Sequence, residues 1–284
     1  MKSTTAIETN ADIKILRLDA SKNDPLWDLT ELWQHRELLS FLIWREIKVR
    51  YKQTAIGVAW AVFQPLITMV IFAVVFGNFA KMPSDGLPYP VFAYSALLPW
   101  AYFSQAIGRA GFSLVGDASL LQKVYFPRLI LPLAAVIVPL LDFLLAFVIL
   151  LVMIAWFGIT PTWAILMLPF FLLLALLTAL AVGLWISPLN VKYRDINIVV
   201  PVMTQLWMYA SPVVYPLSMI PEKWQFFYAL NPLVGVISGF RWALLGNTKP
   251  DLQLIGVSFL VVSLILWGGI IFFKRAEPTF ADIV

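Results

Sequence analysis

The chain has 284 residues, of which 61% are hydrophobic and 13% are charged, about half the charged share of a soluble domain. This composition excludes a soluble globule, because too few polar side chains are present to cover a surface that faces water. Cysteine is absent and His35 is the single histidine, so the sequence excludes a disulfide framework and a thiolate metal site and leaves little room for metal chemistry.

The first 28 residues are polar and mixed in charge, and we expect a flexible cytoplasmic N-terminus without a cleavable signal peptide. Residues 29–53 place apolar side chains at mostly helical spacing among charged ones, which predicts an amphipathic helix. Because this helix runs directly into the first apolar segment, we expect it to lie in the cytoplasmic membrane interface. A soluble helix docked on protein is the alternative. The residues expected to act at this interface are Trp33, Arg36, Trp44, Arg45 and Arg50.

Long charge-free runs follow, each near or above the ~20 residues that cross a bilayer. They cover residues 53–80, 86–108, 143–191, 196–221 and 252–273. The run 143–191 is long enough for nearly two spans, and a turn at 158–161 (Gly-Ile-Thr-Pro) divides it. With a further span near 129–157, the sequence predicts an all-α integral membrane protein with six transmembrane helices within residues 54–273 and a cytoplasmic tail at 274–284.

Asp142 is the one acid well inside a predicted span, and intramembrane acids are functional candidates by default. A proton-coupled carrier usually needs more than one such group. We therefore favour a structural role for Asp142, in which it pairs with a polar or basic neighbour or faces a wet cavity.

A short cytoplasmic helix is predicted between the second and third spans, where residues 115–128 read VGDASLLQKVYFPR. Asp117 or Ser119 can cap this helix, and Phe126 with Pro127 ends it. Such a helix is often only a connector. It becomes functional if another protein must push on it.

Four prolines interrupt the apolar stretch after the fifth span, namely Pro212, Pro216, Pro221 and Pro232. Each proline removes a backbone donor that lipid cannot replace, so a continuous spanning helix is excluded. We predict two short re-entrant helices at the outer face, near residues 222–230 and 233–245. A seventh and an eighth span are the alternative, which the length barely allows.

The positive charges predict the orientation of the chain. Of its 20 Lys and Arg residues, only Lys81, Lys223, Arg241 and Lys249 fall on the side opposite to the termini. Both termini are therefore expected in the cytoplasm, and the net charge of +4 reflects this sorting rather than nucleic-acid binding.

Catalytic motifs are missing from the sequence. It holds no GxxxxGK followed by Ser or Thr, so it cannot cradle ATP phosphates by that route, and it holds no Asp-x-Asp pair or His pair for a membrane enzyme. We expect no catalysis and no cofactor or metal in this chain, and any ATP must be hydrolysed by a partner.

Four motifs together carry a resemblance to a known family. They are residues 44–52 (WREIKVRYK) leading into 57–60 (GVAW) and 64–65 (QP), residues 123–128 (KVYFPR) with Pro132, residues 190–195 (NVKYRD), and residues 211–213 (SPV) followed by 231–232 (NP). From about Leu29 to Arg275, the chain resembles the permease subunit of bacterial type-2 ABC exporters for lipid-linked polysaccharides, which carry O-antigen, capsule or wall teichoic acid.

The resemblance implies a homodimer in the bacterial plasma membrane that engages two copies of a cytoplasmic ABC ATPase, to which ATP and Mg are bound. It implies that the short helix at about 117–126 is the coupling helix and that the two helices before the last span are gate helices at the outer mouth. The coupling residues expected on this basis are Asp117, Leu120, Leu121, Lys123, Tyr125 and Phe126.

A polysaccharide channel needs weak, repeated contacts, which aromatic rings stacked on sugars supply. The aromatic residues expected to contribute are Trp60, Phe63, Phe72, Phe76, Trp100, Tyr102, Phe103, Trp207 and Tyr209. Interface anchoring and lipid contact are the alternatives for each of them. Small residues at Ala55 and Ala59, and at Gly57 and Ala61, permit a close dimer seam at the start of the first span.

Two other transport functions stay open at this point. One is export of a drug or free lipid by a related ABC exporter. The other is a stand-alone secondary carrier, which the shortage of intramembrane charges and of internal repeats disfavours.

Overall fold

The computed structural model describes residues 29–52, 59–246 and 251–280, and every regular element in these ranges is helical. In chain order the elements are α1 (Leu29–Gln34), α2 (Arg36–Lys52), α3 (Ala59–Phe72), η1 (Ala73–Phe79), α4 (Tyr89–Gly116), α5 (Ala118–Lys123), α6 (Ile130–Ile137), α7 (Pro139–Trp156), η2 (Trp163–Met167), α8 (Leu168–Lys192), α9 (Ile196–Tyr209), η3 (Leu217–Met219), α10 (Glu222–Tyr228), α11 (Pro232–Leu245), α12 (Leu252–Ala276) and η4 (Glu277–Thr279). The all-α prediction is confirmed for these ranges. The predicted flexible segment 1–28 and the seam residues Ala55 and Gly57 lie outside the described residues.

Four helical stretches of the described chain are long and apolar enough to cross a membrane. They are Ala59–Phe79, Ile130–Trp156, Trp163–Lys192 and Leu252–Thr279. Each coincides with a predicted span. The other two predicted spans correspond to α4, which has 28 residues, and to α9, whose 14 residues are fewer than the ~20 of a straight crossing.

Helix α4 is the centre of the molecule and packs against α3, α6, α7, α8, α9 and α11. Because protein surrounds α4, most of its residues are buried and it needs no continuous lipid-facing apolar run. Its approach to α8 depends on small residues, since a Cβ added at Gly183 would lie 2.6 Å from the Cβ of Ala110. A larger side chain at Gly183 would push the two helices apart.

The predicted span at 129–157 consists of two helices, α6 and α7, which meet at Val138 and Pro139. Pro139 has no N–H for the preceding turn, so one helix ends and the next begins there. The predicted turn after this span is confirmed, because Gly158 adopts a positive φ of 66° and the chain then reverses into η2 and α8.

The proline-rich stretch contains two short helices, as predicted. Helices α10 and α11 begin and end within two residues of the expected bounds. Pro232 occupies the first turn of α11, where its missing N–H costs nothing. Gly246 closes α11 in the left-handed conformation, with φ 68°.

The prediction of one continuous helix over 29–53 is wrong at His35, where a turn separates α1 from α2. The His35 ring nitrogen Nδ1 lies 2.9 Å from the Glu31 carbonyl oxygen, which is also the acceptor of the His35 backbone N–H. The side chain therefore competes with the helical hydrogen bond at this point.

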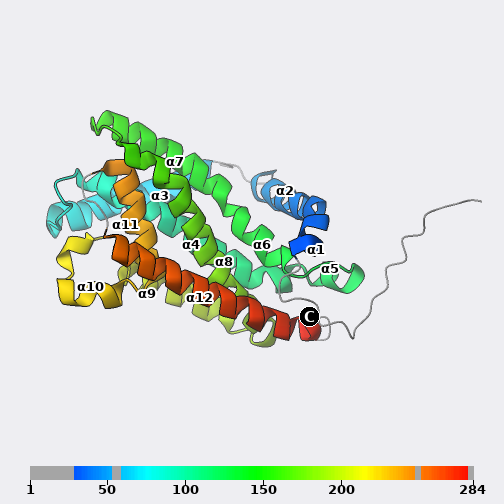
Figure 1. Cartoon of the computed structure of the whole chain (residues 1–284). Coiled ribbons are helices and arrows are strands. Elements are labelled where there is room, and N and C mark those ends of the chain that lie inside the picture. The colour runs from blue at the N-terminus through cyan, green and yellow to red at the C-terminus, as the bar shows by residue number, and fades with distance from the viewer. Residues whose placement is uncertain (1–28, 53–58, 247–250, 281–284) are drawn as a thin grey trace, which may run out of the picture.

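The buried apolar side chains form two separate cores. The larger core joins α4, α7, α8 and α11, and the smaller core joins α2, α5, α6 and the C-terminal end of α12. Figure 1 shows α10 and α11 at one end of the bundle and α1, α2 and α5 at the other. We call these the α10–α11 end and the α2–α5 end.

Candidate functional site

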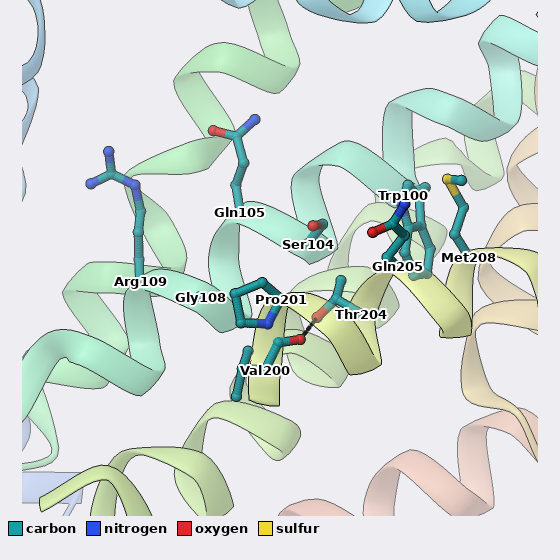
Figure 2. Close-up of a pocket in the computed structure, with 10 residues that line it drawn as sticks. All are labelled: Trp100, Ser104, Gln105, Gly108, Arg109, Val200, Pro201, Thr204, Gln205 and Met208. Carbon is teal, nitrogen blue, oxygen red and sulfur yellow. Dashed lines mark hydrogen bonds between the residues drawn. The ribbon is translucent and has the colours of Figure 1, made fainter. Parts of the chain in front are cut away.

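A pocket of about 530 Å³ lies between α4 and α9 (Figure 2). Its lining comprises Trp100, Ser104, Gln105, Gly108 and Arg109 from α4 and Val200, Pro201, Thr204, Gln205 and Met208 from α9. Figure 2 shows Trp100 and Met208 together at one end and Arg109 toward the other. The pocket therefore has an aromatic end and a cationic end.

The chemistry of the lining combines an indole ring, two carboxamides, two hydroxyl groups and one guanidinium. Carboxamides and hydroxyls both donate and accept hydrogen bonds, and an aromatic face packs against C–H groups. The Thr204 hydroxyl donates to the Val200 carbonyl at 2.7 Å, which keeps that side chain along α9. This lining suits a ligand rich in hydroxyl groups, and the described residues contain no cluster of acids and His that would hold a metal.

The cationic end of the pocket is attached to α2. Arg109 Nη1 lies 3.3 Å from Glu46 Oε2, and Gln105 Oε1 accepts a hydrogen bond of 2.9 Å from Arg50 Nη2. Two consecutive turns of α4 are thus held by two turns of α2. Sequence periodicity does not reveal this arrangement, because the partners are 55 and 63 residues apart.

Asp142 is buried in α7 and pairs with α2. Its Oδ2 lies 2.5 Å from Arg50 Nη2, and its Oδ1 accepts a hydrogen bond from the Tyr51 hydroxyl. A buried carboxylate that meets a guanidinium and a phenol has the polar and basic neighbours that a structural role requires, and that role itself stays a prediction. Arg50 thereby joins α7 to the pocket wall through Gln105.

Asp117 precedes α5 directly, but its predicted capping role is wrong. Its side chain makes no capping hydrogen bond, because Oδ1 accepts a 2.7 Å hydrogen bond from Arg45 Nη2. Partial burial lowers the pKa of Arg45, but the hydrogen bonds and charges of Asp117 and Glu46 outweigh burial and raise the pKa above its ordinary value. Arg45 therefore keeps its charge, and its hydrogen bond to Asp117 ties α2 to the start of α5.

The predicted coupling segment divides into a buried and an exposed face. Leu121 and Phe126 belong to the smaller core, whereas Lys123 and Tyr125 are exposed, Tyr125 by 64%. Leu120 packs beside this core. Helix α5 ends at Lys123, so Tyr125 lies on an extended loop rather than on the helix.

The C-terminal turn holds the far end of this segment. The Arg128 guanidinium donates to the Glu277 carbonyl and lies 5.9 Å from the centre of the Phe280 ring. Phe280 is 1% exposed and packs edge-on against Phe273 in the smaller core. The predicted tail is therefore packed against the fold as far as residue 280.

The nine aromatic residues predicted for a channel occupy three kinds of position. Those buried in the larger core are Phe72, Trp100, Tyr102 and Phe103, with Phe76 and Trp207 packed against it. Those exposed on the surface are Trp60, Phe63 and Tyr209. Trp100 alone among the nine lines the pocket.

On the amphipathic helices the predicted residues face in two directions. Trp33 and Trp44 are exposed, with Arg36 and Lys48 over their rings at 5.3 and 5.2 Å. Arg45 and Arg50 point inward to the ion pairs described above. One face is therefore aromatic and cationic, as at a membrane interface, and the other is bonded to protein.

Arg241 is a buried cation that sequence reasoning counted among the outer charges. It is 7% exposed, lies over the Phe92 ring at 3.6 Å, and donates to the carbonyls of Pro212 and Val213 at 2.8 Å each. A third hydrogen bond of 3.3 Å reaches the Phe92 carbonyl. The signal in the sequence was a lone arginine within an apolar helical segment.

Asn231 holds the same end of the molecule. Its Oδ1 accepts from Trp207 Nε1 at 2.9 Å and from the Leu233 N–H at 3.1 Å, which caps α11. Its Nδ2 donates to the Ala210 carbonyl at 3.0 Å. One carboxamide thus joins α9, the proline-rich stretch and α11.

Comparison with known proteins gives a family match and several relatives. The model of a family described as ABC-2 type transporter matches residues 37–245. An O-antigen export system permease protein RfbA from Myxococcus xanthus is 30% identical over 257 residues, which cover 89% of this chain and 98% of that protein. A protein of the same name from Klebsiella pneumoniae is 27% identical over 252 residues, or 87% and 95% of the two chains. The polysialic acid transport protein KpsM from Escherichia coli is 28% identical over 218 residues, or 72% and 80%.

Proposed function

This chain belongs to the ABC-2 type transporter family, and we propose that it is the permease subunit of an ATP-driven exporter of a lipid-linked polysaccharide in the bacterial plasma membrane. The observation that carries the proposal is its similarity to an O-antigen permease over 98% of that protein's length. The family is a membrane permease without catalytic activity of its own, and the ATPase is a separate subunit.

The pocket between α4 and α9 supports a saccharide substrate. Sugar hydroxyls can bond to Gln105, Gln205 and Thr204, while the Trp100 ring offers a face for sugar C–H groups. Such contacts are individually weak, as a long polymer in transit requires. Of the nine predicted aromatic residues, we keep as channel candidates the exposed Trp60, Phe63 and Tyr209 and also Trp100, which is buried in the core but lines the pocket; the other five lie in or against the core and do not line it.

We further propose six spans, with α4 and α9 as the second and fifth, and both termini in the cytoplasm. A central helix such as α4 would cross the membrane surrounded by other helices of the protein rather than by lipid. The short α9 is continued by the proline-rich stretch, which Arg241 and Asn231 hold in place. The excess of Lys and Arg on the side of the termini supports the orientation.

A homodimer with two ATPase subunits would cover exposed side chains on α9, on α3 and beside α5. Helix α9 exposes Ile198, Val202 and Leu206 at intervals of four residues, by 71, 50 and 58%. Helix α3 exposes Trp60, Phe63 and Ile67 in a similar stripe, by 51 to 55%. We assign these stripes to the second copy of the chain and to lipid, and the exposed Lys123 and Tyr125 beside α5 to the ATPase.

The test is co-expression with the ABC ATPase subunit of the same genome, followed by purification and reconstitution in lipid vesicles. We expect a complex of two permeases and two ATPases whose ATP hydrolysis rises with lipid-linked glycan and drives glycan export. A permease that purifies and transports without an ATPase would overturn the proposal.

The assignment of α5 is tested in the same vesicles with Tyr125→Ala. Because Tyr125 is exposed, its loss should lower glycan export per ATP several-fold while the folded permease is retained. Trp156→Ala removes an aromatic that is 86% exposed at the end of α7 and serves as the control. Phe126 is unsuited to this test, because its side chain is in the core.

A further inference from the structure

We propose that Arg45 and Glu46 form a charge relay that reports a saccharide in the α4–α9 pocket to the coupling helix α5. The relay comprises Arg109 at the pocket, Glu46 and Arg45 on α2, and Asp117 at the start of α5. The inference rests on the proposed function, because it takes the pocket as the saccharide site and α5 as the contact to the ATPase.

The four side chains form one continuous line of alternating charge. Arg109 Nη1 is 3.3 Å from Glu46 Oε2, Glu46 Oε1 is 3.2 Å from Arg45 Nη2, and Arg45 Nη2 is 2.7 Å from Asp117 Oδ1. Arg45 Nη2 is therefore shared by two carboxylates. If Glu46 loses its contact to Arg109, its carboxylate attracts Arg45 more strongly, and the ion pair between Arg45 and Asp117 becomes weaker.

The link between Arg109 and Glu46 is the one that a ligand can replace. Its 3.3 Å exceeds the ~2.7–2.9 Å of a strong charge-assisted hydrogen bond, whereas the link from Arg45 to Asp117 is within that range. Arg109 also lines the pocket, so its guanidinium can donate to a saccharide oxygen. A saccharide that draws Arg109 away leaves the full charge of Glu46 to Arg45 and weakens the link to Asp117.

The relay moves against a fixed support. One turn further along α2, Arg50 is anchored to Asp142, whose side chain is 4% exposed, and to Gln105 on the pocket wall. The difference lies in the carboxylates, since Glu46 is 37% exposed and Asp142 only 4%, whereas Arg50 at 26% is nearly as exposed as Arg45 and Arg109 at 32 and 30%. The exposed links can exchange partners while the buried link holds α2 in place.

The test measures the fold-stimulation of ATP hydrolysis by lipid-linked glycan in the reconstituted complex. Glu46→Gln removes the competing charge, so Arg45 stays on Asp117 and stimulation should fall to about one-fold. Arg109→Gln frees Glu46 permanently, so hydrolysis without glycan should rise toward the stimulated wild-type rate. The two variants thus shift the unliganded rate differently, which a general loss of packing would not do.

Two further variants separate the relay from simple destabilisation. Arg109→Lys keeps a cation and should restore part of the stimulation. In ATP hydrolysis without glycan, the double variant Glu46→Gln with Arg109→Gln should behave as Glu46→Gln alone, because Arg109 reaches α5 only through Glu46. Lys52→Gln removes an exposed charge from the same helix and should leave both rates unchanged. Assembly with the ATPase, measured by size-exclusion chromatography, checks that each variant is folded.

Equal glycan stimulation in wild type, Glu46→Gln and Arg109→Gln would overturn the relay and leave the proposed function standing. If the wild-type complex neither responds to glycan nor exports it, the proposed function fails and the relay fails with it.

Discussion

The two ends of the molecule are held together by different kinds of polar contact. At the α10–α11 end, side chains of Arg241 and Asn231 donate to main-chain carbonyls of the proline-rich stretch. At the α2–α5 end, charged side chains bond mainly to other side chains, as Arg45 does to Asp117, and Arg128 adds a bond to the main-chain carbonyl of Glu277. The first kind of contact satisfies a broken backbone, and the second kind joins separate helices.

The two kinds of contact follow from the backbone at each end. Prolines free carbonyl groups inside an apolar environment, where each unsatisfied group is costly, so buried donors are fixed permanently to them. Helices that dock on one another already satisfy their backbone hydrogen bonds internally. Their partly exposed charged side chains can therefore exchange one partner for another. We therefore expect the α10–α11 end to be rigid and the α2–α5 end to be adjustable, and the following substitutions test that contrast in order of expected effect.

The largest effect is expected for Arg241→Met. It removes a guanidinium whose three nitrogens each donate one hydrogen bond, to the carbonyls of Phe92, Pro212 and Val213, and this loss should lower the free energy of unfolding by about 3–5 kcal/mol. Thermal unfolding in detergent measures the loss. Arg275→Met, at an exposed position on α12, is the matched control, and equal behaviour of the two variants would refute the structural role of Arg241.

Asp142→Asn should lower the free energy of unfolding by about 2 kcal/mol. This is less than for the loss of a fully buried ion pair, because its partner Arg50 is 26% exposed. Replacing both partners, as Asp142→Leu with Arg50→Met, should be milder than Asp142→Asn alone, since no charge is left unpaired. Unfolding measurements on the three variants decide this. A normally stable Asp142→Asn variant without transport would instead indicate a transport role for Asp142.

Asn231→Ala should lower stability by about 1–2 kcal/mol, through loss of the cap of α11 and of the hydrogen bonds to Trp207 and Ala210. Asn197→Ala is the comparison, because Asn197 lies in the first turn of α9 near the opposite end. Differential scanning fluorimetry checks the ranking, and a larger loss at Asn197 would argue against a special role for Asn231.

Arg45→Gln should change stability least, by under ~1 kcal/mol, because partly exposed ion pairs contribute little. High salt should reduce even that difference. The same variant should nevertheless impair the coupling of ATP hydrolysis to export. A stability loss comparable to that of Arg241→Met would contradict the contrast between the two ends.

Local chemistry predicted much of the fold. The turn at 158–161, the interruption of the chain by prolines and the helices α10 and α11 follow from backbone rules that act over a few residues. The favoured structural pairing of Asp142 also followed from general cost arguments. The turn and the two helices depend on each residue's own neighbours in sequence, whereas the partners that Asp142 finds, Arg50 and Tyr51, are distant, Tyr51 by 91 residues.

The missed features depend on partners far apart in the chain. Asp117 binds Arg45 across 72 residues and Arg241 binds the Phe92 carbonyl across 149, distances at which periodicity carries no information. The same limit explains the aromatic residues, because Trp100, Tyr102 and Phe103 are all buried and spacing alone does not show that Trp100 lines the pocket. Only the packing of α4 on all sides distinguishes them.

The clasp between Arg128 and the C-terminal turn has a consequence for biosynthesis. Glu277 is 149 residues beyond Arg128, so at ~5–20 residues per second the ribosome reaches Glu277 about 7 to 30 s after it has added Arg128. During that interval the slot for Phe280 in the smaller core is unfilled. The surface beside α5 is therefore completed only after α12 has been synthesised, which would favour recruitment of the ATPase by finished rather than nascent permeases.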